Sequence, residues 1–276
     1  MGDSGRMGLV AVPREIRPLY ELLDQEGAER YGASVLRFGT AGGGAVALAE
    51  VPPGPVNAAL GAQALVTHCR VTALLSFGSA GALARGLSTG DLVIAQRAIA
   101  HDAGTFLGHR FEPSGILGRG GKGRIGWRRS FEADPGLVAL ALDAARRLGV
   151  RAHTGTVVTG NQAIFSTARR RWLHRTFDAL AVEMETAAVA QVAMAHELPW
   201  VAVRAISDAA SDELILDYGR LRFYLDDRRP AWRCHVDRWS YLLSHPVSWR
   251  RLSQLRRGLA RASEQASRLV EDMLLK

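Results

Sequence analysis

Short apolar runs alternate along the chain with longer segments in which apolar residues recur at helical spacing. Such runs, bounded by turn signals, are typical of buried strands, and they occupy residues 8–12, 35–38, 45–50, 73–77, 92–95, 156–159 and 199–206. Helical spacing covers residues 15–24, 56–69, 186–197 and 252–275. Alternating strands and helices favour a sheet that is covered on both faces. The sequence therefore predicts a three-layer α/β/α fold with a central mixed sheet.

Two stretches lack this regular pattern. Residues 109–130 are rich in Gly and Arg, and we expect a long surface loop there. Residues 218–250 mix Arg with Tyr, Phe and Trp, a composition typical of a lid, a subunit contact or an element at a membrane surface. We expect one domain over residues 1–276, in which this basic aromatic segment is extra and residues 251–276 form a C-terminal helix.

Small and polar residues follow several of the predicted strands. In open α/β sheets, ligands bind beyond the carboxyl ends of the strands. Here those ends carry residues 78–81, residues 159–165 and the pair Ser207-Asp208, and Glu15 follows the first strand. Residues 78–81 read Gly-Ser-Ala-Gly and predict a turn that a ligand can approach closely. Such a turn alone is weak evidence for a site, and it lacks the spacing of a phosphate-binding P-loop.

Glu183 and Glu185 flank Met184 where an apolar strand is expected to pass into a helix. Two residues apart on an extended segment, the two carboxylates point to the same side. This pair is the strongest single indication of a site. The alternative is a carboxylate that only complements the dipole at a helix N-terminus.

Arg204 lies within an apolar strand that ends at Ser207-Asp208. A buried guanidinium is costly unless it is paired or used, so this strand end is a second candidate for chemistry. The alternative for Asp208 is an N-cap of a following helix.

Composition limits the classes of function. The net charge of +8 invites a nucleic-acid interpretation, but nearly all of the positive charge is Arg, with Lys122 and Lys276 as the lysines. We favour a solvated basic face and no nucleic-acid partner.

Cys69 and Cys234 form no metal-binding motif, and we expect both to be free thiols. Since no apolar run is long enough for a membrane span or a secretory signal, we expect a cytoplasmic protein.

Four segments, in their order, resemble the methylthioadenosine/S-adenosylhomocysteine nucleosidases of the purine nucleoside phosphorylase superfamily. They are Ala-Val-Pro-Arg-Glu at 11–15, Phe-Gly-Ser-Ala-Gly at 77–81 with Gly-Asp at 90–91, Val-Glu-Met-Glu at 182–185 and Val-Arg-Ala-Ile-Ser-Asp at 203–208. The resemblance spans residues 8–212. It implies a homodimer that needs no metal or redox cofactor and cleaves the N-glycosidic bond of a 5'-substituted adenosine.

The resemblance also implies roles for individual residues. Asp208 is the general acid that protonates the purine, and an Asp in this role needs a pKa raised by desolvation or by a neighbouring negative charge. Glu185 binds the ribose hydroxyls, and Glu15 acts on the attacking water. The rest of the implied substrate-binding set is Ser79, Ala80, Gly81, Ile164, Phe165, Glu183, Met184, Arg204 and Ser207.

Two other functions stay open. Phosphorylases of this superfamily carry an Arg shortly before the Gly-Ser turn, whereas residues 75–77 here read Leu-Ser-Phe, which favours hydrolysis. The Leu-Ser-Phe-Gly run and the Arg-rich tail also resemble the hopanoid-associated nucleoside phosphorylases, so a lipid-linked adenosine is the alternative substrate. A basic nucleic-acid or membrane-binding module without activity is the remaining alternative.

Overall fold

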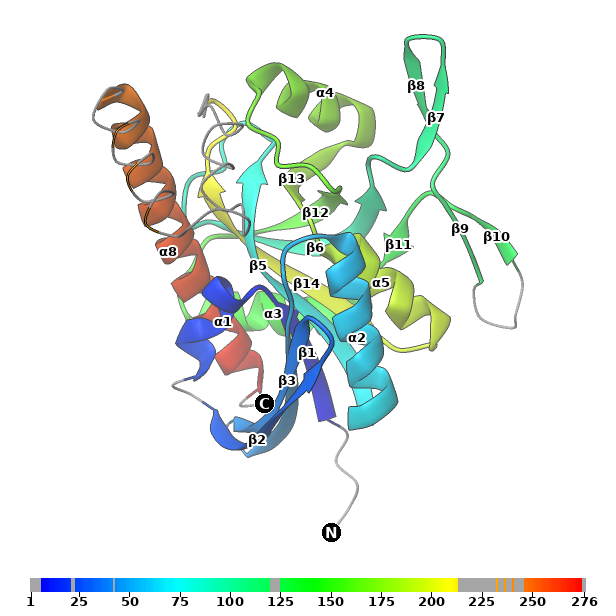
Figure 1. Cartoon of the computed structure of the whole chain (residues 1–276), viewed down its shortest axis with the longest axis vertical. Helices are drawn as coiled ribbons and strands as arrows, with labels where there is room; N and C mark the ends of the chain where they lie inside the picture. The colour runs from blue at the N-terminus through cyan, green and yellow to red at the C-terminus, as the bar shows by residue number, and fades with distance from the viewer. Residues whose placement is uncertain are drawn as a thin grey trace.

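One large sheet with helices on both faces forms the body of the protein (Figure 1). The computed structural model describes residues 6–20, 23–41, 43–119, 125–212 and 246–274, together with residues 232, 236 and 240. The strands of the sheet are β1 (Arg6–Ala11), β2 (Asp24–Tyr31), β3 (Ser34–Ala41), β4 (Gly44–Glu50), β5 (Val71–Ala82), β6 (Leu92–Ala100), β11 (Phe131–Glu132), β12 (Ala152–Thr159), β13 (Ala179–Glu183) and β14 (Trp200–Asp208). The helices are α1 (Pro13–Tyr20), α2 (Pro55–Cys69), α3 (Pro135–Arg147), α4 (Thr167–Phe177), α5 (Thr186–Ala195) and α8 (Pro246–Leu274).

The strand order is β11-β6-β12-β13-β5-β1-β4-β3-β2, and β14 pairs with both β5 and β6. Strand β1 runs parallel to β4 and β5, whereas β3 is antiparallel to β2 and β4. The predicted mixed sheet and the three-layer α/β/α arrangement are therefore confirmed.

Successive side chains of the central strands enter opposite layers. In β1, Leu9 packs into the core beneath α1, α3 and α8, and Val10 packs into the core beneath α2 and α5. In β14, Val203 packs into the same core as Leu9, and Ala202 packs into the same core as Val10. All nine residues of this strand are buried. A strand that is covered on both faces needs apolar residues at every position. For this reason the sequence shows these strands as continuous apolar runs.

Two elements differ from the sequence prediction near the N-terminus and in β5. The helix expected over residues 15–24 ends at Tyr20, and Asp24 begins β2. Strand β2 lies at the edge of the sheet and is exposed along nearly its whole length, so it has no apolar pattern to detect. Residues 78–81 form no turn, because β14 pairs with them and continues β5 to Ala82.

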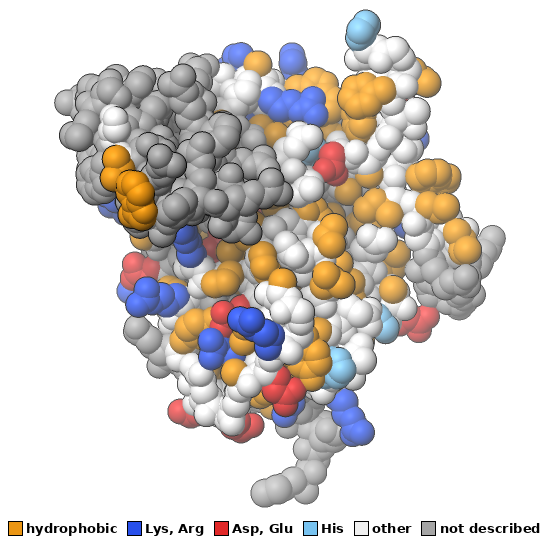
Figure 2. Space-filling model, in the orientation of Figure 1, with side chains coloured by type: hydrophobic (Ala, Val, Ile, Leu, Met, Phe, Trp, Pro, Cys, Tyr) orange, Lys and Arg blue, Asp and Glu red, His pale blue; other side chains and the backbone are white. Residues whose placement is uncertain are grey.

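The prediction of a long loop over residues 109–130 is wrong as well. Two hairpins, β7 (Gly104–Leu107) with β8 (Arg110–Pro113) and β9 (Ile116–Arg119) with β10 (Ile125–Arg128), project from the sheet (Figure 1). Apolar side chains of these hairpins appear in orange on the face shown in Figure 2. Five of them are more than half exposed: Phe106, Leu107, Leu117, Ile125 and Trp127. Their strands pair only with each other, so no burial alternation marks them in the sequence.

The segment at 218–250 lies almost entirely outside the described residues. The predicted C-terminal helix is present as α8 and begins earlier, at Pro246. Helices α3 and α4 were not predicted.

No helix in the described part of the chain is both long and apolar enough to cross a membrane. Cys69 is a buried free thiol, and Cys234 falls outside the described residues.

Helix α8 lies against β14 at a glycine. A Cβ atom on Gly258 would come within 2.0 Å of the Ser207 carbonyl oxygen, so only glycine permits this approach. Gly-to-Ala replacement in a helix ordinarily stabilises by about 1 kcal/mol. Here we expect Gly258→Ala to lower the free energy of unfolding by about 1–3 kcal/mol, since the added methyl must displace the backbone. Urea denaturation measures the change, and Gly27→Ala, where no atom lies within 4 Å of the added Cβ, is the control. A more stable Gly258→Ala protein would contradict this packing.

Candidate active site

A cavity of about 300 Å³ opens where β1, β13 and β14 end. Every predicted site residue except Arg204 lines it. Those residues are Glu15, Ser79, Ala80, Gly81, Ile164, Phe165, Glu183, Met184, Glu185, Ser207 and Asp208. The carboxylates of Glu15, Glu185 and Asp208, which are far apart in the sequence, thus face one shared space.

Glu15 enters the cavity from the first turn of α1. Its Oε1 accepts hydrogen bonds from the backbone N–H of Ser79, at 2.9 Å, and from the Ser79 hydroxyl. Its Oε2 is buried and has no hydrogen-bond partner in the described part of the protein. Burial raises the pKa of Glu15, and Arg204 and the Ser79 hydrogen bonds oppose this rise. One oxygen of Glu15 is therefore fixed, while the other keeps its hydrogen-bonding capacity unused.

Gly78 lets Glu15 and Arg204 approach the same point of β5. A Cβ atom on Gly78 would lie 2.1 Å from Glu15 Oε2 and 2.9 Å from the Nη1 atom of Arg204. The φ angle of Gly78 is +153°, a backbone conformation that residues other than glycine rarely adopt. Gly78 therefore gives a carboxylate and a guanidinium room at one point of β5, and it is not a turn residue.

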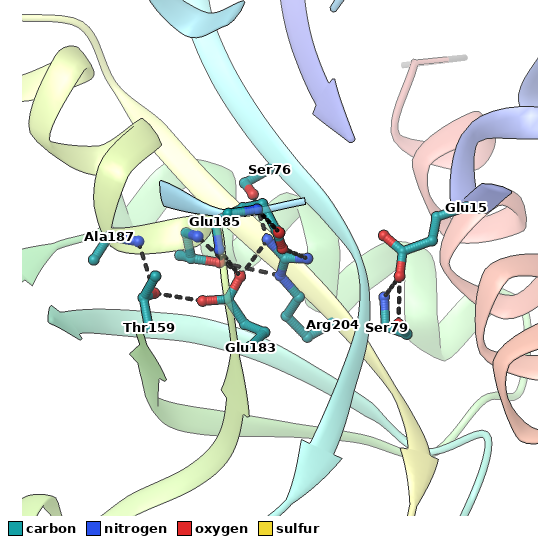
Figure 3. Close-up of polar contacts among 10 residues, drawn as sticks. Glu15, Ser76, Ser79, Thr159, Glu183, Glu185, Ala187 and Arg204 are labelled. Atoms are coloured by element: carbon teal, nitrogen blue, oxygen red, sulfur yellow. Dashed lines mark hydrogen bonds and ion pairs between the residues drawn. The ribbon is translucent and has the colours of Figure 1, made fainter. Parts of the chain in front are cut away.

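Arg204 lies among Glu183, Glu185 and Ser76, as Figure 3 shows. Its side chain is 1% exposed and contacts both motif carboxylates, Glu183 at 2.6 Å and Glu185 at 3.6 Å. Its remaining hydrogen bonds go to the hydroxyls of Ser76 (2.6 Å) and Thr186 (3.0 Å). The buried Arg that the sequence indicated is therefore paired, and it holds the acidic motif against β5.

Glu183 is the most heavily bonded carboxylate of the site. Its Oε2 accepts the backbone N–H groups of Glu185 and Thr186, each at 2.9 Å, and its Oε1 accepts the Thr159 hydroxyl. Thr159 in turn accepts the backbone N–H of Ala187 at 2.9 Å. Glu183 thus satisfies the free donors at the start of α5, which is the helix-terminus alternative that the sequence left open. It lines the cavity, but both of its oxygens are engaged.

Glu185 presents the freer carboxylate of the motif. Its Oε1 accepts the backbone N–H of Gly54 at 3.0 Å, and its Oε2 has only the longer contact to Arg204. Burial, with the negative charge of Glu183, raises the pKa of Glu185 to about 7, and Arg204 opposes the rise. Glu185 therefore has capacity to bind a ligand.

Asp208 is the last residue of β14 and is 7% exposed. Its Oδ1 accepts the Ser207 hydroxyl at 2.5 Å, and its Oδ2 accepts a hydrogen bond from Arg170. Of the two features expected around a general acid, burial is therefore present, whereas the charged group in contact with Asp208 is a cation and not a negative charge. Residues 209–212, which directly follow Asp208, form no helix, so Asp208 is not an N-cap.

Arg170 is the residue that sequence reasoning missed. It is 1% exposed, and besides Asp208 it donates to the carbonyl oxygens of Ile164 (3.0 Å) and Ala209 (2.8 Å). It stands in an Arg-rich run that was interpreted as a solvated face. The run does not show which Arg points inward, and the helix that carries it was not predicted.

The raised pKa of Glu185 gives a stability prediction. Because this pKa, about 7, exceeds the ordinary value of 4.5, the folded protein holds the proton more tightly than the unfolded chain. The resulting stability is fully present below about pH 4.5 and is lost as the pH rises through 7. We expect the free energy of unfolding of the wild type to fall between pH 5 and pH 8, relative to Glu185→Gln, by on the order of 2 kcal/mol. Urea denaturation at each pH measures this, with the exposed Glu26→Gln as control; parallel wild-type and Glu185→Gln profiles would contradict it.

Comparisons with known proteins identify the family. The family model of the phosphorylase superfamily matches residues 7–218. A 5'-methylthioadenosine/S-adenosylhomocysteine nucleosidase of Neisseria meningitidis, in complex with methylthio-immucillin-A, is similar in structure (TM-score 0.72, 24% identity, 98% of each chain covered). Futalosine hydrolase of Helicobacter pylori is similar too (TM-score 0.74, 23% identity, 98% of this chain and 97% of that chain).

A nucleosidase of Helicobacter pylori, solved as an Asp-to-Asn variant with 5'-methylthioadenosine in its active site, gives a TM-score of 0.73 at 24% identity, with 99% of this chain and 98% of that chain covered. At such identities these likenesses establish the nucleoside phosphorylase-like fold. The family model spans most of the sequence and includes every residue of the cavity that precedes α8. The chain belongs to the phosphorylase superfamily.

Proposed function

We propose that this protein hydrolyses the N-glycosidic bond of a 5'-substituted adenosine, such as methylthioadenosine or S-adenosylhomocysteine, and releases adenine. The observation that carries the proposal is the shared cavity of Glu15, Glu185 and Asp208. Cleavage of this bond needs a proton for the departing base, stabilisation of a cationic sugar and an activated water. The three carboxylates supply one of these functions each.

Asp208 serves the departing base. As the bond between C1' and the purine breaks, its electron pair moves to the base, and Asp208 delivers a proton to the purine N7. The Ser207 hydroxyl and Arg170 fix the two oxygens of this carboxyl group, so its position is set before the substrate binds. Ile164 and Phe165 line the same cavity and contact the base.

Glu185 serves the sugar. Its less engaged oxygen binds the ribose hydroxyls, and Met184 beside it packs on the ribose ring. Negative charge at this position stabilises the oxocarbenium-like transition state, because a buried site screens the attraction less than water does. The Glu185 pKa of about 7 means that this charge develops near neutral pH.

Glu15 serves the water. Its unpartnered Oε2 accepts a proton from the water as the water oxygen bonds to C1'. Ser79 holds the other oxygen and so aims the carboxylate. The raised pKa of Glu15 makes its carboxylate a stronger base than an exposed one.

The charge of the cavity favours hydrolysis over phosphorolysis. Four carboxylates line it, from Glu15, Glu183, Glu185 and Asp208. Among the described lining residues Arg170 is the cation, and it is paired with Asp208. A phosphate dianion would meet repulsion here, whereas a neutral water would not. The expected homodimer, the membrane contact and the cytoplasmic location stay predictions.

Product analysis tests this proposal. We expect purified protein to release adenine and free methylthioribose from methylthioadenosine, at a rate that inorganic phosphate does not change. The Asp208→Asn variant should release adenine at least ~10²-fold more slowly, since positioned proton transfer contributes this much or more. Chromatography of both products measures the outcome. Formation of a sugar phosphate that requires added phosphate would show a phosphorylase instead.

A conservative change at Glu15 separates its role in catalysis from substrate binding. In Glu15→Gln the Ser79 hydrogen bonds can persist, but the base is lost, so we expect kcat to fall by ~10²-fold or more. The Kd for methylthioadenosine, measured by calorimetry, should change little. The exposed Glu26→Gln is the matched control for both constants. A normal kcat in Glu15→Gln would remove Glu15 from the mechanism.

A further inference from the structure

A second cavity, of about 470 Å³, lies between the segment that follows β5, the first turns of α4 and the residues that follow β14. None of its described lining residues also lines the candidate active site. The two cavities are therefore separate. A volume of this size is within the range of cavities that bind small organic molecules.

The second cavity combines apolar surface with positive charge. Leu83 and Leu87 are buried side chains that provide the apolar surface. Arg85 and Arg171 each bring one guanidinium group, from two different segments, and both side chains are exposed. No carboxylate stands among the described lining residues. The cavity thus favours a ligand that is partly apolar and carries a negative charge.

The two arginines are available to such a ligand. Neither has an ion-pair partner within the described part of the chain. The carboxylates nearest in the sequence are engaged elsewhere, because Asp91 pairs with Arg151 and Asp212 accepts the backbone N–H of Ala209 at 2.9 Å. Arg recognises a planar anion through paired hydrogen bonds, so two unpaired guanidinium groups in one cavity are suited to a carboxylate.

The walls of the second cavity adjoin the groups that hold Asp208. Ala209 lines the cavity, and its carbonyl oxygen accepts a hydrogen bond from Arg170 at 2.8 Å. On α4, Arg170 contacts Asp208, whereas the next residue, Arg171, lines the second cavity. A ligand in this cavity therefore contacts both segments that position Asp208 without entering the active site.

We propose that the second cavity is a binding site for a small carboxylate with a compact apolar body. The guanidinium groups of Arg85 and Arg171 receive the carboxylate, and the two leucines receive the apolar body. The hydroxyls of Thr167 and Ser211, which also line the cavity, supply further donors. The inference goes beyond the proposed function and stands without it, because binding here needs no catalysis.

Benzoate and its neutral isostere benzamide test this inference. We expect the Kd for benzoate, from a ligand-observed NMR titration at neutral pH, to be about fivefold lower than the Kd for benzamide, the most that one exposed ion pair ordinarily contributes. Added NaCl should reduce this difference, because salt screens exposed arginines. Inorganic phosphate lacks the apolar body and should not displace benzoate at equal concentration.

Variants assign the preference to this cavity. In the double variant Arg85→Gln, Arg171→Gln, the Kd values for benzoate and benzamide should become equal. The matched control is the double variant Arg30→Gln, Arg175→Gln, which removes the same charge from two exposed arginines that line neither cavity. This control should keep the wild-type difference between the two Kd values.

Equal Kd values in the wild type would overturn the inference, and so would a preference that survives in the Arg85→Gln, Arg171→Gln variant. Displacement of benzoate by an equal concentration of inorganic phosphate would refute the role of the apolar surface. Kinetics provide a separate readout: the KM for methylthioadenosine should not rise in proportion to benzoate, and a proportional rise would show that benzoate occupies the active site instead. If methylthioadenosine is not cleaved, the proposed function fails, and the Kd values alone decide this inference.

Discussion

The buried guanidinium of Arg204 is the group on which the rest of the site depends. At 1% exposure it is shielded from bulk solvent, so its charge must be compensated by protein groups. Glu183 and Glu185 provide that compensation from one element, and Ser76 provides a hydroxyl from the neighbouring strand. The dependence is mutual, because two carboxylates two residues apart would repel each other without the cation between them. Arg204 thus fixes the spacing of β5, β14 and the start of α5 in a single cluster.

This cluster also sets the chemical character of the two carboxylates that remain available. Burial raises the pKa of both Glu15 and Glu185, and Arg204 limits the rise in each case. Without the guanidinium, the pKa of both groups would lie higher still. Without the burial, both would behave as ordinary surface carboxylates. The balance of desolvation against one fixed cation suits both to the roles proposed for them.

The sequence shows the parts of the fold and site whose physical signal is local. β14 was predictable because burial on both faces imposes an unbroken apolar run, and Arg204 stood out because it breaks that run. β2 was missed because an exposed edge strand imposes no pattern. Arg170 was missed because its helix is polar over most of its surface, so no apolar stripe shows which Arg points inward. Its neighbour Arg169 stacks on Trp172 at 4.0 Å instead, a division that only the helix geometry reveals.

Arg170 fixes the position of the proposed acid, Asp208. Its guanidinium donates to the Asp208 carboxylate and to the backbone carbonyl oxygens of Ile164 and Ala209, so one buried cation joins the end of β14 to the segment that precedes α4. Ile164 and Asp208 both line the cavity. In the proposed reaction, the group that holds the acid is therefore also bonded to a residue that faces the base, and one hydrogen-bonded unit sets the position of the acid relative to the base.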